Sequence, residues 1–260
     1  HIRVVEGDKA VGQGYSSWKV TREADCTRAG EKQRTCIYCG HVEKVQTTPA
    51  KGHKYGSWKT TKGSTVLNKG QQERICRVCK KKETKSIAKL KATIRLNVSG
   101  TIPLRTNQTF NVRVTMGKGD KVASWKSSNK RIVSVDRNGK IRGLRAGRTA
   151  TITVQLRSGL KKSFKVKVQK TNVATSSLKV TNASTGKRVS SKASLKRNQT
   201  LRLAVTVSPI TSRERVTYSS SDRRIVSVSS RGVIRANRRG KAIVTVRSGK
   251  KTYKIRVTVK

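Results

Sequence analysis

Two internal repeats constrain this chain more than any other feature of its sequence, because repeated segments fold into repeated structural units. In the first part of the chain, residues recur at an offset of 40: Tyr15 and Tyr55, Trp18 and Trp58, Gly30 and Gly70, Cys36 and Cys76, Cys39 and Cys79. In the second part the offset is 91–93: Asn107-Gln108-Thr109 recurs as Asn198-Gln199-Thr200, and Ile132-Val133-Ser134-Val135 recurs as Ile225-Val226-Ser227-Val228. These repeats predict four units, which span residues 1–49, 50–88, 89–170 and 171–260.

The two later units have the residue pattern of antiparallel β-sandwiches. Apolar and polar residues alternate at a period of two over 110–115, 164–168 and 255–259, as in a strand with one buried face. Glycines punctuate these runs at turn positions. The two earlier units are each too short to bury much apolar surface alone. The expected fold is therefore all-β, with two small Cys-rich modules before two tandem sandwiches.

Several motifs recur in order in both later units. In the first of them they are Trp125-Lys126-Ser127-Ser128-Asn129, Ile132-Val133-Ser134-Val135, Gly139-Lys140-Ile141, Ala146-Gly147 and Thr151-Ile152-Thr153-Val154. In the second copy Tyr218 stands in place of Trp125. Residues 89–260 thus resemble two bacterial immunoglobulin-like domains of group 2. This resemblance implies Ig-like sandwiches outside the cell, with a spacer or adhesive role, as in intimin- and invasin-type adhesins.

The first part of the chain carries a different set of motifs. They are Tyr15-x-x-Trp18, Cys26, Cys36-Ile37-Tyr38-Cys39-Gly40 and Gly52-His53-x-Tyr55-x-x-Trp58. These motifs resemble the short Cys/His repeats of Gram-positive surface proteins, and the resemblance implies the surface of a Gram-positive bacterium as the location. The second copy departs from the pattern, since Val66 stands where Cys26 would recur and Lys81 replaces His41.

A metal site is the first chemical prediction, with Cys26, Cys36, Cys39 and His53 as the ligands. Two cysteines in a C-x2-C turn, a third cysteine and a histidine can complete a tetrahedron around zinc, and a closed four-ligand site of this kind is structural. His41 could substitute for His53. A disulfide and free thiols are the alternatives. A disulfide suits a small exported module, although five cysteines cannot all pair within the chain. Cys76 and Cys79 lack further ligands in their own module and are expected to form a thiol pair or a strained disulfide.

The charge of the chain supports a second prediction, polyanion binding. The chain has 62 Lys and Arg against 12 Asp and Glu, and residues 89–260 hold 43 of the basic residues with only Asp120, Asp136, Glu214 and Asp222 against them. Self-repulsion of this size is tolerated near a polyanion. The predicted contacts are five basic pairs: Lys130 and Arg131, Lys161 and Lys162, Arg223 and Arg224, Arg238 and Arg239, Lys250 and Lys251. The predicted partner is an anionic cell-wall or host polymer, such as teichoic acid or an acidic or sulfated glycan.

Enzymatic functions fit this sequence poorly. No histidine follows His53, which excludes a Ser–His pair within the basic units. We therefore expect a non-enzymatic, extracellular bacterial surface or adhesion protein. Two alternatives stay open, namely a structural spacer of a larger surface protein and a DNA-binding protein that contacts phosphates without reading sequence. No apolar run is long enough for a membrane helix. The chain begins at His1 and ends in the strand-like run 253–260, so we expect it to be an excerpt of a longer protein.

Overall fold

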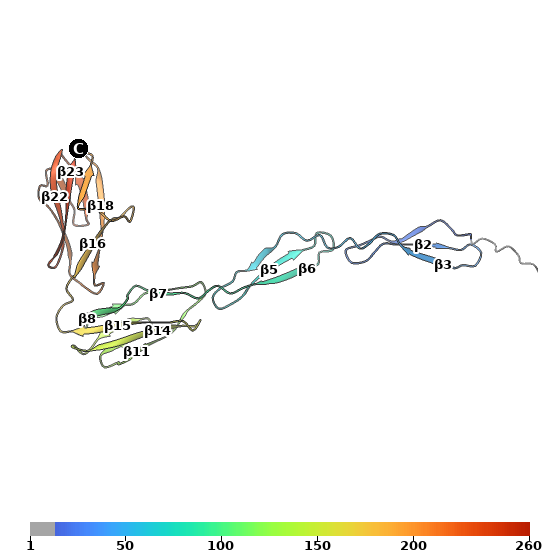
Figure 1. Ribbon diagram of the computed structural model, residues 1–260, viewed down its shortest axis with the longest axis horizontal. Coiled ribbons are helices and arrows are strands. Elements are labelled where there is room, and N and C mark those ends of the chain that lie inside the picture. Colours follow the sequence, from blue (N-terminus) through green and yellow to red (C-terminus); the bar gives the residue numbers. More distant parts are fainter. Residues whose placement is uncertain (1–13) are drawn as a thin grey trace, which may run out of the picture. The chain divides into compact units, whose positions relative to one another are not determined.

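The described part of the chain folds into β-structure alone, in agreement with the all-β prediction (Figure 1). The structure is a computed structural model that describes residues 14–260, and these residues form 23 strands and no helix. A helix able to span a membrane is accordingly absent from this described range. The chain divides into two compact units, of which the first ends at Leu90 and the second comprises Lys91–Lys260. This division lies close to the predicted boundary after residue 88.

Each Cys-rich module is a three-stranded antiparallel sheet. The strands of the first module are β1 (Lys19–Arg22), β2 (Glu31–Thr35) and β3 (Val42–Gln46), in the order β1-β2-β3. Those of the second module are β4 (Lys59–Lys62), β5 (Gly70–Ile75) and β6 (Lys82–Ile87), in the order β4-β5-β6. The two registers correspond at the repeat offset, because Lys19 pairs with Gln33 and Lys59 pairs with Glu73.

Stacked cations and aromatic rings take the place of a hydrophobic core in these modules. The guanidinium of Arg34 lies 4.2 Å from the ring centroid of Tyr15 and 4.6 Å from that of Trp18, and it also pairs with Glu43 at 2.6 Å. The second module repeats this group with Arg74, Tyr55, Trp58 and Glu83. Contacts of this kind at half-exposed sites stabilise only modestly, so each module needs another source of stability.

The second unit consists of two sandwiches. The first contains β7 (Ile94–Leu96), β8 (Thr101–Arg105), β9 (Thr109–Asn111), β10 (Val114–Met116), β11 (Val122–Ser127), β12 (Val133–Val135), β13 (Lys140–Gly143), β14 (Thr149–Leu156) and β15 (Lys161–Gln169). Its sheets have the orders β11-β14-β15-β8, β12-β13-β9 and β10-β7. The second contains β16 (Ser177–Asn182), β17 (Lys192–Leu195), β18 (Thr200–Ser208), β19 (Val216–Ser220), β20 (Val226–Val228), β21 (Val233–Ala236), β22 (Gly240–Ser248) and β23 (Lys251–Val259). Its sheets have the orders β16-β18-β21-β20 and β17-β23-β22-β19.

One strand pair in each sandwich departs from the antiparallel prediction. Strand β8 pairs in parallel with β15, and β17 pairs in parallel with β23. In both domains the chain leaves one sheet after its first strand, since β7 pairs with β10 and β16 pairs with β18, and then crosses to the other sheet. A crossover allows parallel pairing, whereas a hairpin does not.

The predicted strand over 110–115 is interrupted in the structure. It forms β9, which pairs with β13, and β10, which pairs with β7. The intervening Val112 is buried, and its N–H donates to the carbonyl of Gly139. In the second sandwich β18 makes the same change of partner without a break, from β21 to β16. The interruption therefore marks the point where the strand passes from one neighbour to the next.

The cores of the two sandwiches contain an equivalent aromatic ring against an equivalent glycine. Trp125 on β11 packs against the first core, and Tyr218 on β19 packs against the second. A Cβ at Gly139 would lie 2.6 Å from the Trp125 ring, and one at Gly232 would lie 2.8 Å from the Tyr218 ring. Both glycines have a positive φ, +79° and +75°. The substitution of tyrosine for tryptophan is thus accommodated at one conserved packing position of the fold.

Candidate metal centre and basic surfaces

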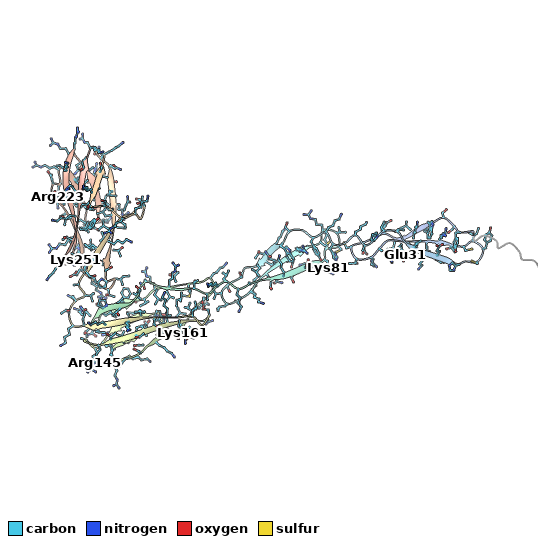
Figure 2. All side chains as sticks on the ribbon, in the orientation of Figure 1. Glu31, Lys81, Arg145, Lys161, Arg223 and Lys251 are labelled. Atoms are coloured by element: carbon cyan, nitrogen blue, oxygen red, sulfur yellow. The ribbon has the colours of Figure 1, made fainter. Side chains whose placement is uncertain are left out.

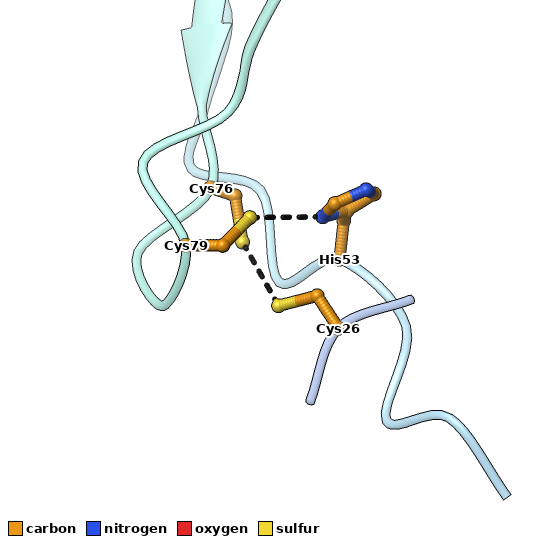
Figure 3. A group of neighbouring side chains, drawn as sticks. All are labelled: Cys26, His53, Cys76 and Cys79. Carbon is orange, nitrogen blue, oxygen red and sulfur yellow. Dashed lines mark hydrogen bonds between the residues drawn. The ribbon is translucent and has the colours of Figure 1, made fainter. Parts of the chain in front are cut away.

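Four metal-ligating side chains from three segments meet where the two Cys-rich modules join (Figure 3). They are Cys26, His53, Cys76 and Cys79, and their ligand atoms all lie within 4.8 Å of one another. The sulfur atoms of Cys26 and Cys76 are 3.8 Å apart. The sulfur of Cys79 lies 3.2 Å from Nδ1 of His53.

The turn between β5 and β6 positions Cys76 and Cys79. The N–H of Cys76 donates to the carbonyl of Lys81 at 2.9 Å, and the N–H of Lys80 donates to the carbonyl of Cys76 at 3.0 Å. Lys80 has φ 62°, which closes the turn. The N–H groups of Cys79 and Val78 point at the sulfur of Cys76 and lower the pKa of this thiol to about 6. These N–H groups, together with the side chains of His53 and Cys79, favour the thiolate form of Cys76.

The other two ligands come from two different segments. Cys26 lies in the loop between β1 and β2, and His53 lies in the connecting segment, residues 47–58, which joins β3 to β4. Cys26 is buried in the loop between β1 and β2, where the carboxylate of Asp25 accepts the N–H groups of Thr27 and Arg28. The N–H of Lys51 donates to the carbonyl of Asp25 at 2.8 Å, which attaches the connecting segment to the first module. These contacts hold the segment that carries His53 beside the loop that carries Cys26.

The second module fixes the same segment from its other side. The N–H of Arg77, within the Cys76–Cys79 turn, donates to the carbonyl of Lys54 at 2.9 Å. His53, which precedes Lys54, thereby lies between the two modules, with its ring 5.2 Å from that of Tyr55. Main-chain hydrogen bonds on both sides thus place the imidazole next to three thiols.

The pKa of the Cys26 thiol is shifted in the opposite direction from that of the Cys76 thiol. Burial raises the pKa of the Cys26 thiol to about 11, and the neighbouring sulfur groups of Cys79 and Cys76 act in the same direction. Three thiolates so close together would repel one another, and a cation bound between them removes this repulsion. The chemistry of the site therefore suits a metal ion bound by thiolates.

The donor set and its spacing fit zinc. Three cysteines and one histidine form one of the usual ligand sets of structural zinc sites. With Zn–S distances of about 2.3 Å, two sulfur atoms of a tetrahedron lie about 3.8 Å apart, and this agrees with the separation of Cys26 and Cys76. Four protein ligands leave no open position for a substrate. A metal in this site would accordingly have a structural role.

The structure brings together two of the four ligands predicted from sequence and replaces the other two. Cys26 and His53 meet Cys76 and Cys79, whereas Cys36 and Cys39 lie in the equivalent turn between β2 and β3. Among residues 14–260 that turn gathers no third ligand. All five cysteines are free, and His41 is exposed outside the group. The thiol pair expected at Cys76 and Cys79 is therefore present, with two ligands from outside its module.

The difference between the predicted ligands and those that the structure gathers follows from the direction of strand β2. The loop with Cys26 precedes β2, and the turn with Cys36 and Cys39 follows it. Five residues of extended strand span about 17 Å, so the two groups lie at opposite ends of one small sheet. The recurrence at an offset of 40 was the signal that could have found the set gathered in the structure, because it places the next C-x2-C turn beyond the end of the first module.

The basic residues of the second unit are all available at the surface. Every Lys and Arg of residues 91–260 is exposed, and the ten predicted contact residues are among them. Figure 2 shows Arg145, Lys161, Arg223 and Lys251 on the outside of the two sandwiches. The predicted pairs lie in turns or at strand ends, for example Arg223 and Arg224 between β19 and β20, and Arg238 and Arg239 between β21 and β22. The structure thus displays the predicted cations without showing what they bind.

Further basic residues lie on the outer faces of the sheets, where strand alternation places them. On β15, Lys165 and Lys167 point outward between the buried Phe164, Val166 and Val168. On β23, Lys254 and Arg256 point outward between Ile255, Val257 and Val259, and Lys192 on β17 pairs with Arg256. Adjacent residues of a strand point to opposite faces, whereas residues at i and i+2 share one face.

The acidic side chains of the second unit accept hydrogen bonds from backbone N–H groups. Asp136 accepts the N–H groups of Asn138 and Lys140, and Glu214 accepts the N–H of Thr175. Asp120 accepts the N–H of Lys121, and Asp222 accepts that of Arg224. Residues 14–260 contain five ion pairs, and all five are formed by residues within 22–83, in the Cys-rich modules. The cations of the two sandwiches therefore have no acidic side-chain partner within 4.0 Å.

These features define a class of protein: tandem immunoglobulin-like β-sandwiches with a basic surface, preceded by small modules with a thiol and imidazole centre. The chain belongs to the bacterial Ig-like domain (group 2) family, whose model matches residues 99–168 and 183–259. The resemblance inferred for the two later units is thereby confirmed.

Comparison with individual proteins finds similar sequences and folds. An uncharacterized protein of Clostridium acetobutylicum is 36% identical over 127 residues, which cover 48% of this chain and 12% of that protein. Domains 4 and 5 of the S-layer protein SbsC are 18% identical and cover 65% of this chain and 98% of that one, with a TM-score of 0.31. Drosophila N-cadherin EC1-3 is 9% identical and covers 98% of this chain and 92% of that one, with a TM-score of 0.36.

Proposed function

We propose that this chain is part of a non-enzymatic, extracellular surface protein of a Gram-positive bacterium, and that its two sandwiches bind anionic polymers by charge. Membership of the bacterial Ig-like family supports the surface role. The motifs of the Cys-rich modules, which resemble repeats of Gram-positive surface proteins, support the assignment to that kind of cell.

The binding proposal rests on one observation: acidic side chains do not neutralise the positive charges of residues 91–260. In residues 91–260 all basic side chains are exposed, and all four acidic side chains are hydrogen-bonded to backbone N–H groups. A folded domain that concentrates so much positive charge is destabilised by self-repulsion, and a bound polyanion relieves this cost. The charge is also mounted on rigid strands, which keep it in place for a long ligand.

The ligand class follows from the chemistry of the surface. Arginine and lysine recognise phosphate, sulfate and carboxylate groups, which recur regularly in teichoic acids and in acidic or sulfated glycans. Such a polymer can contact many cations over an extended face and needs no deep pocket. DNA offers the same phosphate chemistry, and sequence-independent DNA binding is the second candidate. A structural spacer without ligand is the third.

The test is the salt dependence of binding by the whole chain to poly(glycerol phosphate) teichoic acid, heparin and duplex DNA. We expect the logarithm of the affinity to fall linearly with the logarithm of the salt concentration, with a slope for duplex DNA of about −0.9 per phosphate neutralised. DNA duplexes of different sequence should bind equally. Absence of binding to all three polymers at low salt, or binding that salt leaves unchanged, would support the spacer instead.

We also propose that Cys26, His53, Cys76 and Cys79 bind one structural zinc ion. The mutual approach of the four ligand atoms within 4.8 Å supports this proposal. Elemental analysis of protein purified without added metal should find one zinc per chain. A stoichiometry near zero, together with a disulfide between Cys26 and Cys76 in mass spectrometry, would overturn it.

A further inference from the structure

We infer that the metal centre is a crosslink between the two Cys-rich modules, so that bound zinc joins them into one unit and zinc removal separates them. This inference rests on the zinc binding proposed above and concerns what the ion does. Its basis is the origin of the ligands. Cys26 belongs to the first module, Cys76 and Cys79 belong to the second, and His53 lies in the segment between them (Figure 3).

The modules have few other means of holding together. Their buried apolar side chains, within residues 14–90, are Ala24, Cys26, Cys36, Val66 and Cys76. Three of these five are cysteines, and two of the three are ligands of the centre. The junction also has main-chain hydrogen bonds, among them the bond from Lys51 N–H to the carbonyl of Asp25 and the bond from Arg77 N–H to the carbonyl of Lys54. Exposed hydrogen bonds of this kind open easily unless something else restrains the chain.

The two modules supply different ligands, and the repeat offset of 40 shows in which order along the chain they do so. The first module supplies one thiol, Cys26, from the loop before its second strand. The second module supplies the C-x2-C turn with Cys76 and Cys79. In the second module Val66 occupies the position equivalent to Cys26, and the sandwiches that follow contain no cysteine. At the position of His53 in the first module stands Gln13. The counterparts of Cys26 and His53 are thus absent at the other repeat position, whereas the C-x2-C turn is present in both modules.

The first module contains an internal control for this inference. Its turn at Cys36 and Cys39 has the same hydrogen bonds as the turn at Cys76 and Cys79, since Cys36 N–H donates to His41 and Gly40 N–H donates to Cys36. It nevertheless gathers no further ligand among residues 14–260. Cys39→Ser therefore removes a thiol from these modules without removing a ligand of the proposed crosslink.

The experiment compares Cys26→Ser with Cys39→Ser in the whole chain, and His53→Ala with His41→Ala as a second matched pair. Zinc content is measured by elemental analysis, and amide hydrogen exchange is followed at Lys51 and Arg77, whose N–H groups form the junction hydrogen bonds. We expect Cys39→Ser and His41→Ala to keep one zinc and slow exchange. Cys26→Ser and His53→Ala should bind zinc at least tenfold more weakly, and their junction amides should exchange at least tenfold faster. A chelator should have the same effect on the unmodified chain.

The outcomes separate the two proposals. An unmodified chain without zinc would overturn the metal centre itself. Full zinc content in Cys26→Ser with unchanged exchange at the junction would leave zinc binding in place and overturn the crosslink, because the ion would then be held by the second module alone. Loss of zinc in Cys39→Ser would also overturn the crosslink, because it would assign the ion to ligands within the first module.

Discussion

The sulfur of Cys26 lies 3.8 Å from the sulfur of Cys76, although these residues are 50 positions apart and belong to different modules. In repeat proteins the stability of the array depends on the interfaces between neighbouring repeats as well as on each repeat. Most such interfaces are apolar. Here the modules have almost no apolar surface to bury, and the interface consists of side chains that could bind a metal, on a hydrogen-bonded connecting segment.

Zinc binding at pH 7 should release at least one proton per ion. The pKa of Cys26 is raised to about 11, so this thiol is protonated at pH 7 until the metal displaces its proton, whereas the pKa of Cys76 is lowered to about 6 and this thiol is already largely a thiolate. Zinc affinity should therefore rise with pH. Calorimetric titration in buffers of different ionisation enthalpy measures the proton count. Binding without proton release would show that Cys26 is not a ligand.

Replacement of Gly139 by alanine should destabilise the first sandwich by about 2–5 kcal/mol, through a strained positive φ and overpacking against Trp125. Gly147→Ala is the matched control, because Gly147 also has a positive φ, +75°, and a Cβ there would meet nothing within 4 Å. Its cost should be about 1 kcal/mol. Urea unfolding of the whole chain measures both. Equal losses in the two variants would show that the Trp125 contact is unimportant.

Glu214 should contribute stability that depends on pH. The N–H of Thr175 donates to its carboxylate at 2.7 Å and lowers its pKa below the ordinary value of 4.5. A carboxyl whose pKa is lower in the folded state stabilises the fold above the unfolded pKa, and this contribution is lost as the pH falls through the folded pKa. Glu214→Gln should therefore lower the urea midpoint at pH 7 and change it little at pH 3. A difference of the same size at both pH values would contradict this assignment.

Neutralising the outer face of β23 should weaken polyanion binding in a salt-dependent way. The double replacement Lys254→Thr and Arg256→Thr removes two exposed charges and keeps a residue type that suits strands. The magnitude of the salt slope for duplex DNA should fall by about 1.8, which corresponds to two phosphate contacts. Lys59→Thr with Lys62→Thr on β4, in a Cys-rich module, is the control and should leave the slope unchanged. Equal effects of the two double variants would argue against a site on the sandwiches.

Much of the fold was predictable because repeats and alternation are local properties of the chain. The in-order motifs around Trp125 and Tyr218 predicted two equivalent sandwiches, and the structure places both rings against equivalent glycines. The parallel pairing of β8 with β15 was missed, since it depends on a crossover between sheets. Adjacent basic pairs were also easier to see than Lys254 and Arg256, which share a face only once the strand is known.

The candidate metal centre shows where sequence reasoning ends. The sequence by itself determined that thiols and imidazoles occur at spacings suited to zinc, and that Cys26 and His53 belong to such a set, because ligand type and short C-x2-C turns are properties of the chain. The tertiary structure alone decided which turn completes the set. Strand β2 carries the chain away from the Cys26 loop, so Cys36 and Cys39 end at the far side of their own sheet. The connecting segment then brings Cys76 and Cys79 back to Cys26, because its hydrogen bonds attach it to both modules.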